Sequence, residues 1–363
     1  MAIADVPSYL HLSTADVDEI ADELDAIRQD VEDSLGAKDA AYIRRVIHFQ
    51  RALDVAARLT IAGSRSKKGW LLGTCALAYS KSIENMELGH NISHGQWDWM
   101  NDPEIHSSTW EWDMVGDSAQ WRYSHNYRHH VFSNVLGMDE DIGYRLLRVT
   151  PDQPWRSWYL VTPLRNLVLA AMFEWGIALH GLHSERLRLD SSDAVAVEKR
   201  KFFGKVTRQL AKDYVVMPAL SMRRWRRTLA ANLTANTIRN LWVYVNIICG
   251  HVPGGAETFD PAVVEDETPG EWYLRQMLGT ANFEVSPLLA ISGGHLCYQI
   301  EHHLFPDLPS NRLPQISVRV RELCEKFDLP YNSASLPRQL FRTQRIIHGL
   351  AIPDWLLTAG RRR

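Results

Sequence analysis

Three short histidine-rich segments restrict the fold more than any other feature of this sequence. They are HNISH at 90–94, HNYRHH at 125–130 and QIEHH at 299–303. Residues three or four positions apart lie on one face of an α-helix, so each segment places metal-binding side chains one turn apart. A single HxxxH pair is usually only a polar surface feature, but three such segments in one chain require three independent coincidences. We therefore expect them to converge on one site.

The number of histidines indicates more than one metal ion. Imidazole is a common ligand of Fe, Zn, Cu and Ni, and one zinc site takes three or four protein ligands. The seven clustered histidines and the isolated His251 exceed that number. Two ions therefore fit the sequence better than one.

Composition narrows the function classes. The 40 Lys and Arg are balanced by 43 Asp and Glu, so no positive excess is available for phosphate backbones and no nucleic-acid partner is expected. The four cysteines form no CxxC pair, and the acidic, polar N-terminus does not read as a signal peptide. These features predict an active part that faces a reducing cytoplasm. The 13 tryptophans indicate that part of the protein contacts a membrane interface, where this residue type is enriched.

Hydropathy limits how this chain could cross a bilayer. Mean hydropathy is −0.24, and every stretch of 18 residues carries charge, so any spanning helices must be few and interrupted. The predicted membrane helices are 41–63, 69–91, 158–182 and 229–250, and the last two are the most apolar. Arg165 and Glu174 interrupt the first of these two, and Arg239 interrupts the second. The basic segment 183–228 would lie between them, against the positive-inside tendency.

The three segments resemble the histidine boxes of the membrane fatty acid desaturase family. The most specific is QIEHHLFP at 299–306, which is similar to the branch that includes linoleoyl-CoA and front-end desaturases. The resemblance covers roughly 70–345 and implies an all-α fold, in which an integral membrane core of about four membrane helices carries a cytosolic helical cap with a di-iron site. By this resemblance, the metal ligands are His90, His94, His125, His129, His130, His251, His302 and His303. Gln299 and His295 are expected to be weak ligands or to support the ligands.

The resemblance also implies the reaction, which is the O2-dependent insertion of a double bond into the fatty acyl chain of an acyl-CoA or acyl-lipid. Because side-chain acids and bases cannot remove hydrogen from an unactivated methylene, a cofactor of two Fe2+ ions and two external electrons are required. HVPGG at 251–255 does not match the haem-binding HPGG motif, so we expect a separate electron donor, a ferredoxin or a flavoprotein reductase. A related di-iron membrane fatty acid hydroxylase is the main alternative. A non-catalytic histidine-rich metal transporter or sensor is a more distant one.

The expected organisation is a polar N-terminal region at 1–40, a desaturase domain at 41–345 and a C-terminal tail at 346–363, in an integral membrane protein whose active site faces the cytoplasm. His180 and His183 fall at the far end of the span 158–182, where interfacial or surface roles are expected. The tryptophans between the first two boxes either anchor an interface or line an acyl tunnel; they are Trp97, Trp99, Trp110, Trp112 and Trp121. Arginines around the second box either bind the phosphates of coenzyme A or a lipid headgroup, or only orient the protein; they are Arg122, Arg128, Arg145, Arg148 and Arg156.

Overall fold

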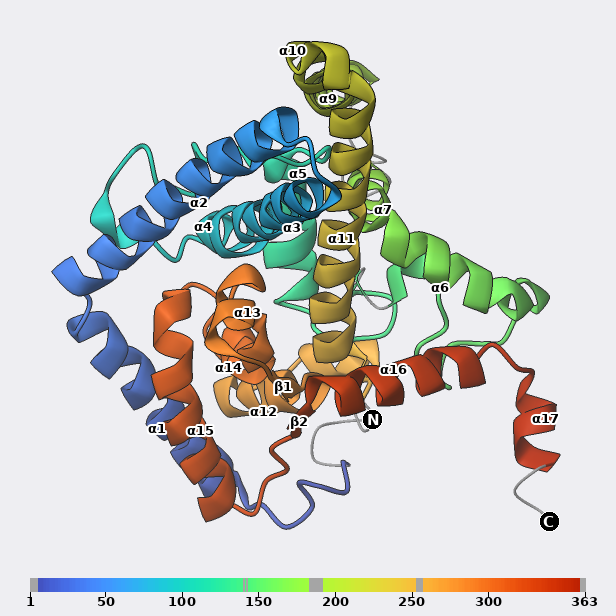
Figure 1. Cartoon of the computed structure of the whole chain (residues 1–363). Coiled ribbons are helices and arrows are strands. Elements are labelled where there is room, and N and C mark those ends of the chain that lie inside the picture. Colours follow the sequence, from blue (N-terminus) through green and yellow to red (C-terminus); the bar gives the residue numbers. More distant parts are fainter. Residues whose placement is uncertain (1–5, 140, 142, 183–191, 253–256, 360–363) are drawn as a thin grey trace.

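The structure is a computed structural model that describes residues 6–139, 141, 143–182, 192–252 and 257–359. Most of this part of the chain is helical, and two short parallel strands lie in its C-terminal half (Figure 1). The α-helices are α1 (Thr14–Asp33), α2 (Ala37–Gly63), α3 (Lys67–Ile83), α4 (Asn91–Ser93), α5 (Ser118–Arg122), α6 (Thr162–Ala171), α7 (Phe173–Leu182), α9 (Ser192–Ala211), α10 (Met217–Leu220), α11 (Trp225–His251), α12 (Pro269–Gly279), α13 (Pro287–Ser292), α14 (Gln299–Leu304), α15 (Leu313–Lys326), α16 (Leu336–Gly349) and α17 (Asp354–Ala359).

Tighter and wider helical turns connect these elements. The π-helical turns are η2 (Glu84–His90), η4 (Tyr123–His129) and η7 (Lys212–Val216), and the 3-10 turns are η3 (Asp98–Met100), η5 (Gly143–Arg145), η6 (Ser157–Val161), η8 (Met222–Arg224), η9 (Pro261–Val264), η10 (Leu296–Tyr298) and η11 (Ser310–Arg312). Strand β1 (Asn282–Glu284) pairs in parallel with β2 (Ser333–Ser335), with Phe283 opposite Ala334.

The long helices α2, α3 and α11 pack side by side through small residues (Figure 1). A Cβ on Gly73 would lie 2.8 Å from Cγ1 of Ile61, so glycine permits the close approach of α2 and α3. The N-terminal ends of α3 and α11 are joined by a hydrogen bond from the indole of Trp70 to the carbonyl oxygen of Arg227, at 2.9 Å. These contacts hold α3, whose C-terminal end leads directly into the first histidine segment.

A separate apolar core lies under the third histidine segment. It is formed by α1, α12, α14 and α15, and it includes the fully buried Ile20 and Leu24 of the N-terminal region. Ser13 begins α1 with a capping box, in which its hydroxyl accepts from the backbone N–H of Asp16 and the Asp16 carboxylate accepts from that of Ser13. This core holds α14 against α1, α12 and α15, so the position of His302 and His303 depends on segments that lie far apart in the sequence.

The predicted integral membrane core is wrong. In the described part of the chain, no helix combines the length and the apolar character needed to cross a bilayer. The span predicted at 158–182 is divided at Met172 into α6 and α7, each of 10 residues and hence about 15 Å long. Helix α11 has 27 residues, but its buried side includes Asn232, Asn236 and Arg239, which lower its mean hydropathy. The same finding overturns the membrane partner and the location as an integral membrane protein with a cytoplasm-facing site.

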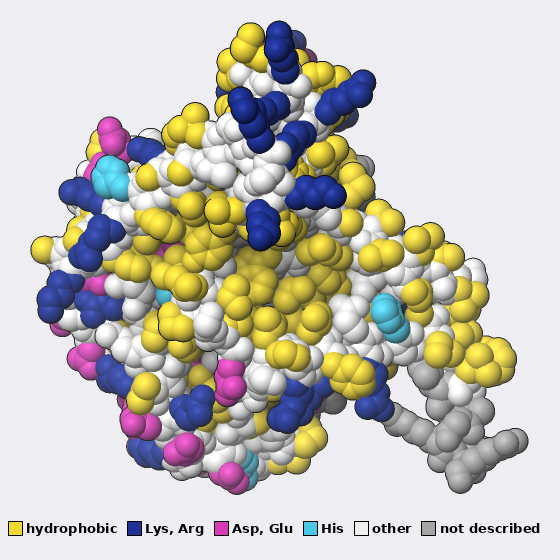
Figure 2. All heavy atoms as spheres, in the orientation of Figure 1, with side chains coloured by type: hydrophobic (Ala, Val, Ile, Leu, Met, Phe, Trp, Pro, Cys, Tyr) yellow, Lys and Arg dark blue, Asp and Glu magenta, His cyan; other side chains and the backbone are white. Residues whose placement is uncertain are grey.

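The charges that interrupt the two most apolar segments pair with each other. Arg239 on α11 donates to the carboxylate of Glu174 on α7, and also to the Asn85 side chain at 2.6 Å. Because buried charges need partners, this pair explains how both segments can hold an ionised residue within the protein. Apolar side chains gather instead on the outer surface over α3, α11 and α13 (Figure 2), where Leu72 and Leu288 are exposed.

Candidate metal centre

The first two histidine segments meet π-helical turns, the first only at His90 and the second over most of its length. His90 ends η2, and His125 and His129 lie within η4, where the backbone N–H of His130 bonds the carbonyl oxygen of His125 five residues earlier. Such wide turns are frequent at functional sites, and this one places His130 beside both residues, with ring centroids 4.9 Å from His125 and 5.2 Å from His129. His302 and His303 lie on the regular helix α14.

The structure brings all eight predicted histidines into one cluster. Ligand nitrogens lie within 4.8 Å of one another in three overlapping groups: His90, His94, His125 and His302; His125, His129 and His130; and His129, His251 and His303. The first and third groups share no residue, while the middle one overlaps both. His130 stacks on His303, with ring centroids 4.4 Å apart, and lies 4.6 Å from His94. The geometry could therefore hold metal, and the number of ions stays a prediction.

The chemistry of the cluster fits a metal. Each of the eight histidines has at least one buried ring nitrogen without a hydrogen-bond partner among the described residues. Such orphaned polar atoms are costly in a protein interior unless they meet an ion or water. Burial lowers the pKa of His90 to about 4 and that of His94 and His302 well below the ordinary value. These imidazoles are therefore neutral, which is the form that coordinates metal.

Several side chains orient the histidines from behind. The carboxylates of Asp139 and Asp141 lie 3.0 Å from Nδ1 of His129 and 3.1 Å from Nδ1 of His125, respectively. Burial opposes the charged form of His129, but these two carboxylates outweigh it and raise the pKa of His129. A carboxylate behind a ligand histidine fixes its tautomer and ring orientation.

Amide side chains play the same part for two other histidines. The Asn91 Oδ1 lies 2.8 Å from Nδ1 of His90, and the Gln276 Oε1 lies 3.0 Å from Nδ1 of His303. The sequence analysis missed these amides and the two aspartates, because nothing in their local pattern marks them. The rule that ligand histidines need acceptors would have drawn attention to the acidic stretch around Asp139, ten residues after His129.

Gln299 lies against the isolated histidine of the cluster. Its side-chain amide is 3.3 Å from Nε2 of His251, while its Oε1 is buried without a partner among the described residues. Gly250 makes this position possible, since a Cβ there would lie 2.7 Å from Cγ of Gln299. Gln299 is thus placed to orient His251, whose Nδ1 faces the other histidines.

His295 lies behind the cluster, at one of the two kinds of position expected for it. Its Nδ1 is 3.2 Å from the buried carboxylate of Glu87, which also accepts from the Asn91 amide at 3.1 Å. His295 is absent from the three groups of converging nitrogens found in the described residues. It therefore reaches His90 only through Glu87 and Asn91.

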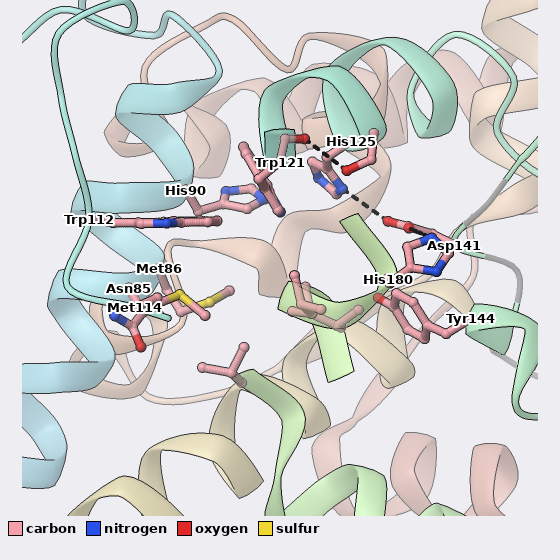
Figure 3. A pocket seen from close by; sticks show the side chains of 14 residues that line it. Asn85, Met86, His90, Trp112, Met114, Trp121, His125, Asp141, Tyr144 and His180 are labelled. Atoms are coloured by element: carbon pink, nitrogen blue, oxygen red, sulfur yellow. Dashed lines mark hydrogen bonds and ion pairs between the residues drawn. The ribbon is translucent and has the colours of Figure 1, made fainter. Parts of the chain in front are cut away.

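An apolar pocket opens beside His90 and His125 (Figure 3). Its cavity volume is about 30 Å³. Its apolar lining consists of Met86, Trp112, Met114, Trp121, Ile177, Val243 and Ile247. Trp112 and Trp121 therefore line a pocket next to the histidine cluster, and their role towards an acyl chain stays a prediction.

His180 also lines this pocket, so the expectation of a surface role is wrong for it. Its Nε2 lies 3.7 Å from the Asp141 carboxylate, and Figure 3 shows both beside Tyr144. The break between α6 and α7 turns this end of the segment towards the cluster rather than away from it. His183 lies outside the described residues.

This helical scaffold and its buried eight-histidine cluster define a class of protein, one that can bind metal next to an apolar substrate pocket. Comparison with known sequences identifies the family. Residues 68–335 match the family model described as fatty acid desaturase. The chain is 53% identical over 360 residues, 98% of its length and 84% of the relative, to the NADPH-dependent stearoyl-CoA 9-desaturase of Mycobacterium tuberculosis. It is 26% identical over 72% of both chains to the sn-1 linoleoyl-lipid 6-desaturase of Arthrospira platensis.

The chain therefore belongs to the fatty acid desaturase family, as its histidine segments indicated. It is an oxidoreductase that introduces a double bond into a fatty acyl chain.

Proposed function

We propose that this desaturase acts on stearoyl-CoA at the 9 position, with electrons that come from NADPH through a separate redox protein. The observation that carries the proposal is the 53% identity, over 98% of this chain, to a protein named for that reaction. The more distant relatives are named for acyl-lipid substrates at other positions, and they cover less of the chain.

We further propose that the eight histidines hold two iron ions, one near His90, His94, His125 and His302 and the other near His129, His251 and His303, with His130 between the two groups. The buried, unpartnered nitrogens and the neutral state of most of the rings support this assignment. Bound iron would supply the O2-derived oxidising power that amino-acid side chains lack. In the overall reaction, the acyl chain loses two hydrogen atoms and forms one double bond. These two hydrogens, two external electrons and two protons reduce O2 to two waters.

Binding and positioning of the acyl chain depend on residues of this protein. Met86, Met114 and Ile177 give the pocket an apolar lining that keeps water from a saturated acyl chain. His90 and His125 line both the pocket and the cluster, so a methylene pair held in the pocket lies next to the ligand groups. Holding one carbon pair at that place is what selects the bond that reacts.

The test uses the purified chain with stearoyl-CoA, NADPH and a reductase system. Mass spectrometry should locate a new double bond at the 9 position, and elemental analysis should find about two irons per chain. His302→Ala should lose iron and product, whereas His48→Ala, an exposed histidine outside the cluster, should retain both. A hydroxylated product, a double bond elsewhere, or an active protein well below two irons per chain would contradict the proposal.

A further inference from the structure

A second pocket lies on the other side of Trp112. Its cavity volume is about 420 Å³, and it is lined by α9, by the start of η7 and by the segment around Trp112. Its cationic residues follow one face of the helix at intervals of three or four positions: Lys201, Lys205, Arg208 and Lys212. On the outer surface, Lys and Arg also gather over the projection formed by α9, α10 and the start of α11 (Figure 2). This pocket is therefore charged where the first is apolar.

Two of the four cations are already engaged. Lys205 forms an ion pair with Glu111, and Lys212 forms one with Asp113. The third carboxylate in the lining, Asp117, accepts from the backbone N–H groups of Ala119 and Gln120 at the start of α5. These pairs hold α9 against the 111–117 segment and so give the pocket its shape.

The other two cations are more accessible to a ligand. Arg208 is exposed and has no ion-pair partner among the described residues. Lys201 forms an ion pair with Glu198 on the same helix at 3.6 Å, but its side chain is 60% exposed, so this pair can exchange for a phosphate. Seven residues separate these two cations, or about 10 Å along the helix. Such a separation suits a ligand with two separate phosphate groups better than a single phosphodiester.

Trp112 is the shared wall of the charged and apolar pockets. Its indole donates to the carbonyl oxygen of Gly116 at 2.8 Å, and its ring lies 5.1 Å from that of Trp121. Gly89 allows this packing, because a Cβ there would lie 2.9 Å from Cβ of Trp112. Trp112 therefore lies between a cationic surface and the apolar space beside the histidines.

We propose that the charged pocket binds the phosphate groups of coenzyme A, while the acyl chain passes beside Trp112 into the apolar pocket. The inference rests on the proposed acyl-CoA substrate and adds where its carrier binds. Two of the arginines around the second histidine segment are engaged elsewhere. Arg148 is buried and donates to Asp354 and to two backbone carbonyl oxygens, and Arg128 lies over the Phe132 ring.

The test compares two double variants on the same helix. Lys201→Ala/Arg208→Ala removes the two more accessible cations, and Lys199→Ala/Arg200→Ala removes two exposed cations outside the pocket lining. The probe is coenzyme A itself, titrated calorimetrically into the iron-loaded enzyme, together with the KM and kcat for stearoyl-CoA. We expect the first variant to raise both the Kd of coenzyme A and the KM about tenfold, as loss of charge-assisted hydrogen bonds to phosphate implies. The second variant should match the unmodified enzyme, and Arg208→Lys should recover part of the lost binding.

The outcomes separate this inference from the proposed function. If stearoyl-CoA is desaturated but both double variants bind coenzyme A equally well, the carrier site is wrong while the function stands. If coenzyme A binding depends on Arg208 but the double bond does not form at the 9 position, the carrier site stands and the function is wrong. Binding of anionic phospholipid vesicles that depends on Arg208, without binding of coenzyme A, would overturn the choice of carrier.

Discussion

The carboxylate of Asp139 accepts a hydrogen bond from Nδ1 of His129 at 3.0 Å, and both side chains are 1% exposed. The backbone N–H groups of Asn134 and Asp141 also donate to this carboxylate, at 2.9 and 2.8 Å. Asp139 is thus anchored by its own loop while it orients His129. The position of one member of the histidine cluster is therefore set by the conformation of the loop that follows it.

This relationship predicts the effect of Asp139→Asn. The amide keeps the size of the side chain but weakens the hold on the His129 ring, so iron affinity should fall by about 10- to 100-fold. Competition with a chelator of known affinity, read by elemental analysis, measures the change. Asp152→Asn is the matched control, because within the described ranges the Asp152 carboxylate accepts from two threonine hydroxyls that lie outside the cluster. Equal iron affinity in the two variants would contradict the role given to Asp139.

Gly250→Ala should disturb the cluster through Gln299. The new Cβ would lie 2.7 Å from Cγ of Gln299, which must then move away from His251. We expect overpacking to cost about 1–3 kcal/mol in the free energy of unfolding, and iron content and desaturation to fall. Gly204→Ala is the control, since no atom lies within 4 Å of its Cβ position on α9 and alanine favours helix. Full iron loading and activity in the Gly250 variant would show that Gln299 does not matter for His251.

Val243→Phe should alter the acyl-chain preference. Val243 is buried on α11 and lines the apolar pocket, so a phenyl ring there reduces the space for substrate. We expect the rate with an 18-carbon acyl-CoA to fall more than the rate with a shorter chain, as measured by mass spectrometry of the products. Leu241→Phe, on the exposed side of the same helix, should leave the ratio of the two rates unchanged. If the ratio of the two rates were unchanged in the Val243 variant, the acyl chain would not enter this pocket.

The ion pair between Asp39 and Arg312 should make stability depend on pH. Burial would raise the pKa of Asp39, but hydrogen bonds from Arg312 and Asn311 outweigh it and lower the pKa below the ordinary 3.8. A carboxyl whose pKa is lower in the folded than in the unfolded protein stabilises the folded state fully at pH values above its unfolded pKa. This stabilisation is lost as the pH falls through the folded pKa. Asp39→Asn should therefore reduce the free energy of unfolding by about 1–3 kcal/mol at pH 7.

The difference between Asp39→Asn and the unmodified protein should shrink below about pH 4, where the carboxyl becomes protonated. The free energies of unfolding of both proteins, measured with urea at pH 7 and at successively lower pH, give this difference. The pair of Arg319 and Asp30 is the control, because the Asp30 side chain is 65% exposed and such pairs contribute less than about 1 kcal/mol. A difference that is the same at pH 3 and pH 7 would contradict the ion-pair explanation.

The spacing of the histidines predicted the cluster well. The seven clustered histidines were found from their spacing, because periodicity within a helix is a local property, whereas His251 has no spaced partner and came from the resemblance. Periodicity did not reveal that the second segment forms a π-helical turn, in which His130 comes close to both His125 and His129. That turn is stabilised by its packing, and no residue in HNYRHH specifies it on its own.

The membrane prediction failed for a related reason. An apolar stretch shows how hydrophobic a segment is, but it does not show where a helix ends or which charges meet. Met172 divides one stretch into two short helices, and Glu174 and Arg239 pair across two segments that lie far apart in the sequence. Both features arise only when the helices are in contact.

The sequence by itself determined the family of this protein, because its three histidine segments already resemble those of the fatty acid desaturases, and their spacing places side chains that could bind metal on shared helix faces. Only the tertiary structure decided which carboxylates and amides stand behind those histidines, that His180 joins the pocket, and that Trp112 lies between an apolar space and a charged one. The physical reason is that ligand spacing depends on bonds along the chain. Orientation, burial and pocket shape depend on contacts between residues that only folding brings together.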